Sequence, residues 1–334
     1  MSVVYVSNAD SREISVLRLD DDGALTLVES QAVDGKVMPL AMSPDHRYLY
    51  ASLRSAPFAV TVFARHPATG RLTPLSSAPL PDNMAYLATD RSGRYLLSAS
   101  YSGDKIAVNP IASDGGVGPP IAVESTPPHA HSILTDPSNR FLLAAALGGD
   151  VILQYRFDAE TGRLTPNEPP QVETAPGAGP RHLVFHPSGA FAFVTNELDG
   201  TVNSYRFESC TGTSTLIASV AVRPPESGGP PWTSELRGTP DGRYLYVAER
   251  TSSTITGFRI DPATGLLDPV GHTPTETQPR GFAIDPSGQF LVVAGQKSDA
   301  VTSYAIDPAT GSLTPRQRLE VGRDPNWVEI IALQ

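Results

Sequence analysis

Residues 175–200 read APGAGPRHLVFHPSGAFAFVTNELDG, the pattern of two apolar strands joined by a tight turn. The first strand, LVF, follows Arg181 and His182. The turn HPSG comes next, and the second strand, AFAFVTN, ends just before Glu197. Because a β-hairpin returns the chain to the edge where it began, we expect Arg181 and Glu197 to lie at the same edge of one sheet.

The same turn and strand recur along the chain. The copies read SPDHRYLYASL, DRSGRYLLSAS, DPSNRFLLAAAL, HPSGAFAFVTN, TPDGRYLYVAER and DPSGQFLVVAGQ, and equivalent positions are 46 to 53 residues apart. A second signature is a strand, an acidic Thr-Gly turn and another strand, as in QYRFDAETGRLTP; it occurs seven times, with one degenerate copy near Gly115. This spacing fits four short strands per repeat, the size of a propeller blade.

The two ends of the chain complete the pattern. N-terminal SVVYVSN resembles the second strand of the repeat without its preceding turn, and C-terminal DPNWVEIIALQ resembles the first strand without its following turn. Together they supply the missing hairpin and close the sheet edge. We therefore predict an all-β, seven-bladed β-propeller, a single domain over residues 1–334, closed by N- and C-terminal strands in one shared blade. The alternative, a pair of β-sandwiches, explains neither the regular period nor the complementary ends.

Composition excludes several classes of protein. The formal net charge of −10 argues against a nucleic-acid partner, because phosphate backbones need a basic surface. Cys210 is the only cysteine, so neither an internal disulfide nor a zinc site of paired cysteines is possible. The N-terminal residues have no signal-peptide pattern, and no apolar run reaches membrane length. We expect a cytoplasmic protein without a membrane partner.

Two classes of loop share one face of such a ring: the loops that enter each first strand and the loops that leave each second strand. The turns DPSG and ATG fall on the opposite face. They recur in nearly every blade, so we interpret them as scaffold. A residue type that occurs in one blade only is a candidate for function.

The candidate face gathers basic side chains in an acidic protein. A cleft lined by one sign of charge attracts ligands of the other sign, and arginine suits carboxylate or phosphate, so we predict a small anionic ligand. The alternative is that these are ordinary surface charges paired with Glu197, Glu249 and Glu276. The residues predicted to bind the ligand are His182, Arg54, Arg250, Gln296, Lys297 and Trp232.

Three histidines leave two interpretations open. His129 and His131 in PPHAHS point the same way in an extended chain, and His182 from the neighbouring blade would complete a metal site. In the other interpretation one imidazole faces the cavity and serves as a general acid–base. Glu197 beside Arg181 is likewise either a salt bridge or a carboxylate that activates water. The motifs GxSxG, HExxH and GxxxxGK[ST] are absent.

The segments GAGPRHLVFHP, VTNEL, PTETQPRGF and VVAGQKS together resemble the bacterial propeller-type 6-phosphogluconolactonases. That lactonase family also includes the fungal carboxy-cis,cis-muconate cyclase, and the resemblance covers essentially the whole chain. It implies a carboxylic-ester hydrolase of the pentose phosphate pathway that converts 6-phospho-D-glucono-1,5-lactone to 6-phosphogluconate without metal or other cofactor. The resemblance to the cyclase implies that the catalytic residues are His131, Glu197, Arg181 and Arg280. The segments NPIASDGGVG and PPESGGPPW depart from the pattern and could alter the pocket rim.

The implied mechanism is attack of water on the lactone carbonyl. Glu197 or His131 takes the proton, and Arg181 or Arg280 stabilises the oxyanion by about 3–4 kcal/mol per donor. Arg54, Arg250 or Lys297 would hold the phosphate of the substrate, and we expect a monomer or weak dimer. Two alternatives remain: a hydrolase or cycloisomerase that acts on another sugar lactone or a muconolactone, and a propeller that serves only as an interaction platform.

Overall fold

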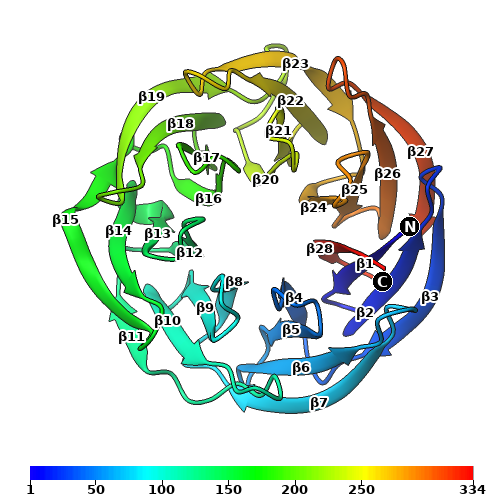
Figure 1. The fold of residues 1–334 in the computed structure, drawn as a ribbon. Coiled ribbons are helices and arrows are strands. Elements are labelled where there is room, and N and C mark those ends of the chain that lie inside the picture. The colour runs from blue at the N-terminus through cyan, green and yellow to red at the C-terminus, as the bar shows by residue number, and fades with distance from the viewer. Residues whose placement is uncertain (334) are drawn as a thin grey trace.

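The computed structural model describes residues 1–333, which form seven four-stranded antiparallel sheets arranged as blades around a common axis (Figure 1). Within these residues the one helical element is a single 3₁₀ turn, η1 (Leu147–Gly149). The predicted seven-bladed propeller is confirmed. No helix in residues 1–333 is long and apolar enough to cross a membrane.

The strands of each blade follow one another outward from the axis. The innermost strands are β4 (Val37–Met42), β8 (Met84–Thr89), β12 (Ala130–Thr135), β16 (Pro180–Phe185), β20 (Thr233–Gly238), β24 (Pro279–Ile284) and β28 (Pro325–Ala332). The second strands are β5 (Tyr48–Leu53), β9 (Tyr95–Ser100), β13 (Phe141–Ala146), β17 (Phe191–Asn196), β21 (Tyr244–Glu249), β25 (Phe290–Gly295) and β1 (Ser2–Asn8).

The third strands are β6 (Ala59–Arg65), β10 (Lys105–Pro110), β14 (Val151–Asp158), β18 (Thr201–Glu208), β22 (Thr254–Ile260), β26 (Ala300–Ile306) and β2 (Glu13–Leu19). The outermost strands are β7 (Leu72–Pro79), β11 (Ala122–Ser125), β15 (Arg163–Glu173), β19 (Thr213–Ala221), β23 (Leu267–Pro274), β27 (Leu313–Glu320) and β3 (Leu25–Ala32).

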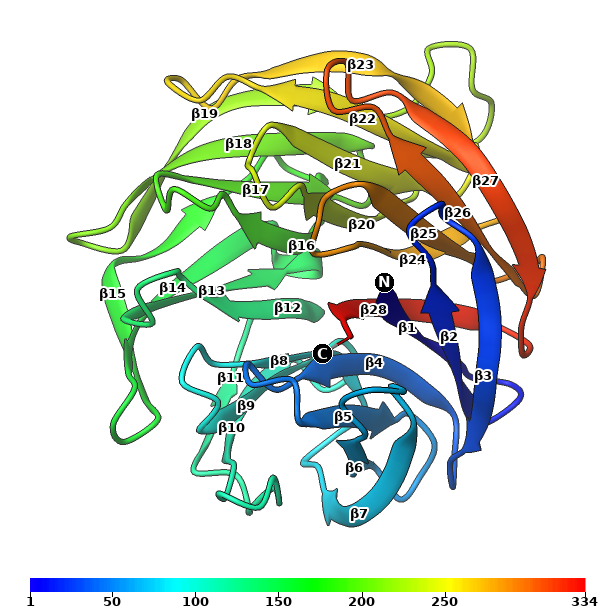
Figure 2. The same cartoon turned by 45° about the vertical axis from the view of Figure 1, so that its right-hand side comes forward.

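The two termini share one blade. Strand β28 pairs antiparallel with β1, with Val4 opposite Ile330, and the sheet continues through β2 and β3. Figure 2 shows β28, in red, beside β1, in dark blue, between the first and last of the other blades. The predicted closure by N- and C-terminal strands is confirmed. Because of this pairing, the shared blade has four strands like the other six.

The recurring Asp-x-Ser turn is held by its aspartate. The Oδ1 atom of Asp90 accepts hydrogen bonds from the backbone N–H groups of Arg94 and Tyr95, each at 2.8 Å, and its Oδ2 atom accepts one from Ser92 at 3.0 Å. Asp136 and Asp285 make the equivalent bonds in their blades. These aspartates therefore serve turn geometry.

The Thr-Gly turns join neighbouring blades. Gly212 has a φ of +73°, and a Cβ atom there would overlap the ring of Phe141 in the preceding blade. Glycine meets both requirements, a left-handed backbone and close contact with an aromatic ring. The same packing recurs where Gly162 meets Tyr95 and where Gly311 meets Tyr244, so this signature also belongs to the scaffold.

A β-bulge interrupts the inner strand of each blade close to its start. In β12, Ala130 pairs with Ala146 and Ser132 pairs with the next residue, Ala145, so His131 has no partner on β13. In β24 the pairing skips Arg280 in the same way. A bulge breaks the strict alternation of side chains and redirects the extra residue. This places one residue of each inner strand at the same end of the ring.

Candidate active site

Seven equivalent bulged positions form a ring at the end of the axis where the inner strands begin. Four positions carry Met38, Ala85, Ser234 and Asn326. The other three carry His131, Arg181 and Arg280. Since four blades close without a histidine or an arginine at this position, these side chains are not needed for the fold. The structure thus brings together three of the residues that the resemblance implied to be catalytic.

Glu197 completes this group from the turn after β17. Its Oε2 atom lies 2.7 Å from Arg181 Nε and accepts a hydrogen bond of 2.7 Å from Arg250 Nη2. The contact between Arg181 and Glu197 is an ion pair without a hydrogen bond. The Oε1 atom of Glu197 accepts a 3.2 Å bond from the indole of Trp232, whose ring lies 3.8 Å from the Arg250 guanidinium carbon.

The interpretation of the basic residues as paired surface charges accounts for only part of this cluster. The carboxylate of Glu249 accepts hydrogen bonds from the backbone N–H groups of Trp232 and Ser252, at 2.7 and 2.6 Å. Glu276 pairs instead with Arg318, at 3.2 Å. Arg280 has no acidic partner within 4 Å among residues 1–333. Positive charge at the mouth therefore exceeds negative charge.

Several buried polar atoms in this cluster have no hydrogen-bond partner in residues 1–333. They are all three guanidinium nitrogens of Arg181, the Nε atom of Arg280, the Nδ1 atom of His131 and the Nε2 atom of His182. Leaving one buried polar group unpaired costs about 1–3 kcal/mol, and more for a charged group. Because native proteins rarely concentrate such groups, the concentration indicates a site for a polar ligand.

Electrostatics set the charge state of the two candidate bases. Burial, together with the positive charges of Arg181 and Arg280, lowers the pKa of His131 well below its usual 6.5. Burial raises the pKa of Glu197, but the cations Arg181, Arg250 and Arg280 outweigh it and leave the pKa lowered. Near neutral pH, His131 is therefore a neutral imidazole and Glu197 is a carboxylate.

The guanidinium groups are crowded. Burial and the repulsion of Arg181 lower the pKa of Arg250 to about 9, although Glu197 opposes the shift. The pKa of Arg280 is lowered by burial and by the like charges of Arg181, Arg250 and Arg54, which outweigh the opposing charge of Glu197. A bound anion would relieve this repulsion.

Below His131 lies a buried pair that the sequence analysis missed. His182 Nδ1 lies 3.1 Å from Glu235 Oε1, and the two side chains are 2% and 3% exposed. Arg237 reaches Glu235 and Glu329 at 3.6 and 3.8 Å. The two-residue spacing of Glu235 and Arg237 in β20 places both on one side of a strand, a signal that was available in the sequence.

Two findings settle the family. Residues 3–330 match the family described as "Lactonase, 7-bladed beta-propeller". The chain belongs to this lactonase family. The lactonase is 42% identical over 330 residues to a 6-phosphogluconolactonase of Serratia proteamaculans, with 99% of each chain covered. It is 40% identical over 331 residues to a 6-phosphogluconolactonase of Pectobacterium carotovorum, again covering 99% of each.

Solved structures agree with this assignment. The lactonase superposes on the periplasmic gluconolactonase of Pseudomonas aeruginosa with a TM-score of 0.93 at 31% identity, covering 100% of this chain and 99% of the other. It superposes on a putative 6-phosphogluconolactonase of Bacteroides fragilis with a TM-score of 0.90 at 28% identity, covering 99% and 98%. The resemblance that the sequence motifs indicated is confirmed.

The remaining predicted ligand residues of the lactonase lie around the rim. Arg54 is partly buried and donates a hydrogen bond to Asn83 Oδ1 at 2.7 Å. Its positive charge is one of those that lower the pKa of Arg280. Gln296 donates to Asp324 at 2.8 Å and accepts from Gln278 at 3.0 Å, so its amide is already engaged. Lys297 is exposed, and its charge contributes to lowering the pKa of Asp10 in the neighbouring blade.

The histidines of the lactonase are not arranged as a metal site. His129 stacks on Tyr101 with ring centres 4.2 Å apart, and its Nδ1 atom lies 3.0 Å from the Tyr101 carbonyl oxygen. The rings of His131 and His182 lie edge to face, 5.0 Å apart. Across residues 1–333, no three His, Cys, Asp or Glu side chains form a group that could hold a metal ion.

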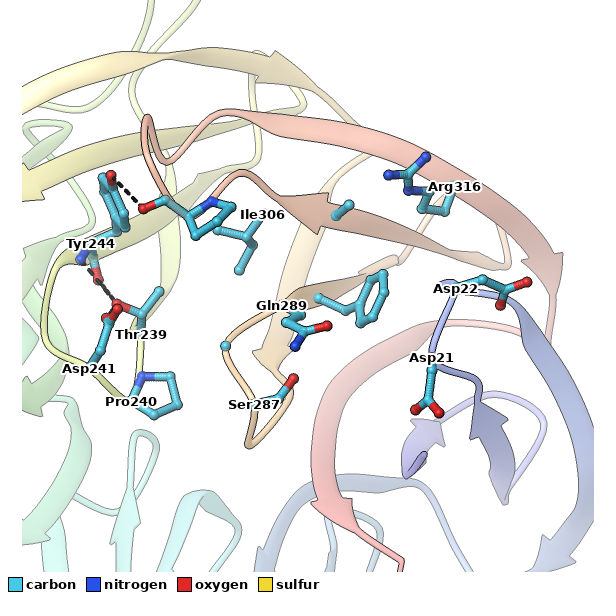
Figure 3. A pocket seen from close by; sticks show the side chains of 14 residues that line it. Asp21, Asp22, Thr239, Pro240, Asp241, Tyr244, Ser287, Gln289, Ile306 and Arg316 are labelled. Atoms are coloured by element: carbon cyan, nitrogen blue, oxygen red, sulfur yellow. Dashed lines mark hydrogen bonds between the residues drawn. The ribbon is translucent and has the colours of Figure 1, made fainter.

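The lactonase also has a pocket of about 650 Å³ on the opposite face, lined by the blades of β20–β23 and β24–β27 and by Asp21 and Asp22 of the shared blade (Figure 3). Thr239, Asp241 and Ser287 of the recurring turns line it, and the hydroxyl of Thr239 donates to Asp241 at 2.6 Å. A pocket of about 440 Å³ lies between two other blades, lined by the equivalent Ser43 and Asp45. Since the pocket repeats with the scaffold, we assign it to blade packing.

Proposed function

We propose that this protein hydrolyses 6-phospho-D-glucono-1,5-lactone to 6-phosphogluconate, a step of the pentose phosphate pathway. The observation that carries the proposal is the buried guanidinium of Arg181, whose Nη atoms have no hydrogen-bond partner in residues 1–333, beside the neutral imidazole of His131 in a chain of the lactonase family. Relatives named 6-phosphogluconolactonase that share about 40% of the sequence over the full length support the choice of substrate.

His131 is the better candidate for the general base. Glu197 is ionised, but two guanidinium groups and an indole N–H stabilise its negative charge, which makes it a weak acceptor of a proton. His131 is neutral, and its Nδ1 atom, the buried one, makes no hydrogen bond in residues 1–333, so Nε2 is the nitrogen assigned to face water. We assign His131 to take the proton from water and Glu197 to hold Arg181 and Arg250 in place.

Arg181 is placed to stabilise the oxyanion. As the oxygen of water bonds to the carbonyl carbon, negative charge develops on the carbonyl oxygen, and the unpartnered Nη atoms of Arg181 can donate to it. A preorganised donor of this kind contributes about 3–4 kcal/mol. The ring C–O bond then breaks, and protonated His131 returns its proton to the departing ring oxygen, which leaves a hydroxyl group and a carboxylic acid.

The phosphate of the substrate would lie on the other side of the mouth. Arg280 has no acidic partner in residues 1–333, and Arg54 is the next cation along the rim. Arg250, considered for this role from the sequence, is instead bound to Glu197 and stacked on Trp232. We therefore assign the phosphate to Arg280 and Arg54, since paired arginines suit a dianion.

The first test measures lactonase activity of the purified protein, with the spontaneous hydrolysis rate subtracted. We expect His131→Ala to lower kcat for the phosphorylated lactone by about 10²–10⁴-fold, the range of general-base contributions. His129→Ala, which changes the neighbouring histidine that stacks on Tyr101, serves as the control. Unchanged kcat in His131→Ala would remove the proposed base.

A second test addresses the phosphate. Arg54→Met should raise KM for 6-phosphogluconolactone by about tenfold, which corresponds to about 1.4 kcal/mol, while changing KM for unphosphorylated gluconolactone little. Equal effects on both substrates would contradict the assignment of Arg54 to the phosphate.

A second candidate function is hydrolysis of an unphosphorylated sugar lactone. It is favoured by the structural similarity to the periplasmic gluconolactonase of Pseudomonas aeruginosa, at a TM-score of 0.93. Comparison of kcat/KM for 6-phosphogluconolactone, gluconolactone and a muconolactone separates the candidates. The expected cytoplasmic location and the monomer or weak dimer remain part of our proposal; cell fractionation and sedimentation test them.

A further inference from the structure

We propose that Glu235 is a positioning residue for this hydrolysis: it fixes the His182 imidazole in the tautomer whose Nε2 lone pair supports protonated His131. The proposal rests on the proposed function for its catalytic consequence. Its structural part, the link between Glu235 and the tautomer of His182, is independent of the substrate.

The pair stands out against the repeat. Glu235 and His182 occupy the third position of their inner strands, facing the axis. The equivalent positions in the other blades carry Pro39, Tyr86, Ser132, Gly281 and Trp327. Because aromatic or small residues fill this layer elsewhere, packing does not require a carboxylate. Burying the charge of Glu235 costs solvation free energy unless a partner compensates it, so we look for the groups that contact this carboxylate.

The hydrogen bonds decide which atom donates. Glu235 Oε1 accepts the backbone N–H of Leu236 at 3.1 Å and lies 3.1 Å from His182 Nδ1, while Oε2 lies 3.6 Å from Arg237. An oxygen that accepts a backbone N–H is not the protonated one, and a proton on Oε2 would face a guanidinium. The His182 Nδ1–H group therefore donates to Glu235.

That donation leaves a lone pair on His182 Nε2, an atom that is buried and has no partner in residues 1–333. Tyr86 and Trp327 pack against the imidazole with ring centres 5.0 and 5.7 Å away, so the ring is held in one orientation. The centres of the His131 and His182 rings lie 5.0 Å apart, and neither His131 Nδ1 nor His182 Nε2 has a hydrogen-bond partner in residues 1–333. When His131 takes the proton from water, the His182 lone pair can accept a hydrogen bond from the resulting imidazolium.

In this arrangement each residue orients or stabilises the next, and the proton itself stays on His131. Glu235 holds His182, and His182 stabilises the cation that forms on His131 in the transition state. Interactions made only in the transition state raise kcat and leave substrate binding unchanged. Loss of Glu235 should therefore appear in kcat rather than in KM.

The test compares Glu235→Leu, which removes the acceptor that faces His182, with Glu329→Leu. Glu329 contacts the same Arg237 but does not contact His182, which makes it a matched control. We expect Glu235→Leu to lower kcat by about 10- to 100-fold with KM changed less than about threefold, and Glu329→Leu to leave both close to wild type. Glu235→Asp, which keeps the charge, should recover part of kcat.

A spectroscopic readout separates positioning from structural damage. In ¹⁵N-histidine NMR spectra, His182 should show the Nδ1–H tautomer in wild type and in Glu329→Leu, and should lose it in Glu235→Leu, where no acceptor faces Nδ1. The proposal is overturned if Glu235→Leu keeps the wild-type tautomer, keeps wild-type kcat, or loses activity equally with Glu329→Leu. If wild type hydrolyses no lactone, the proposed function fails, while the tautomer measurement still decides the structural part.

Discussion

At the scale of single residues, Glu197 is the acid on which the basic cluster depends. It is 13% exposed and contacts both Arg181 and Arg250, which are 0% and 2% exposed. Glu197→Gln would leave two buried cations without a counter-charge. Removal of one partner of a buried ion pair costs about 3–5 kcal/mol.

We therefore expect Glu197→Gln to lower the free energy of unfolding by about 3 kcal/mol, and to lower kcat by displacing Arg181. Urea denaturation followed by tryptophan fluorescence measures the first effect. Glu226→Gln, on an exposed loop, should unfold like wild type. Wild-type stability in Glu197→Gln would show that the guanidinium groups do not need this carboxylate.

The pH dependence of activity follows from the His131 imidazole. Because burial and the nearby cations hold its pKa well below 6.5, the neutral base persists at pH values where a free imidazole is protonated. We expect kcat/KM to stay constant as pH falls through 6.5 and to decline only at lower pH. A decline centred at or above 6.5 would contradict the assignment of His131 as base.

Stability should fall on acidification for the same reason. Below 6.5 the unfolded chain takes up protons at residues 131 and 182 that the folded protein does not bind, so folding is progressively opposed. The lowered pKa of Glu197 acts in the same direction below 4.5. The raised pKa of Glu235 acts in the opposite direction, and replacement of both histidines by glutamine isolates their share.

The sequence allowed the main cluster to be predicted but not its internal pairing. Strand alternation and the hairpin were enough to place Arg181 beside Glu197. Whether an arginine is free or engaged depends on side-chain direction, which is why Arg250 was assigned to the ligand although it binds Glu197. Glu235 was missed because its partner, His182, comes from a different blade.

At the scale of elements, the closure of the ring depends on the close approach of β24 and β28. A Cβ atom on Gly281 would lie 2.6 Å from the Asn326 carbonyl oxygen and 3.0 Å from the Trp327 Cα atom. Both are backbone atoms, so a larger side chain could fit only if the two inner strands moved apart.

Gly281→Val should therefore destabilise the protein by about 1–3 kcal/mol, the usual cost of overpacking. Thermal unfolding followed by circular dichroism measures the change. The control is Gly228→Ala, because a Cβ atom at residue 228 meets nothing within 4 Å. Equal melting temperatures for Gly281→Val and wild type would mean that β24 and β28 tolerate separation.

The elements were easier to predict than their irregularities. The repeated turns fixed the strands of nearly every blade, since each apolar run is bounded by a turn of known geometry. The bulges in the inner strands have no residue signature, because a strand of ordinary composition accommodates them. They nevertheless decide that His131 and Arg280 lie together at the mouth.

At the scale of the whole molecule, the shared blade closes the ring through β28 and β1. Deletion of residues 325–334 would remove an inner strand, leave the edge of β1 unpaired and remove the packing of β28 against β24 and β4. We expect the truncated protein to lose its single cooperative thermal transition and to aggregate, since exposed strand edges pair with other chains. A monomeric truncated protein that melts cooperatively would show that closure is dispensable.

The architecture was predictable because it is periodic. Six copies of one signature and seven of another left a single missing hairpin, and the two ends of the chain supplied it. The repeats do not predict which lactone is the physiological substrate. It depends on the rim, where Arg54 and the loop before Trp232 occur once each.

The central claim is that one end of the ring holds the lactone, and a crystal structure with bound 6-phosphogluconate tests it most directly. The account predicts the product carboxylate within hydrogen-bond distance of Arg181 and His131, with the phosphate between Arg280 and Arg54. Product bound instead in the pocket of Figure 3, or nowhere at saturating concentration, would contradict it.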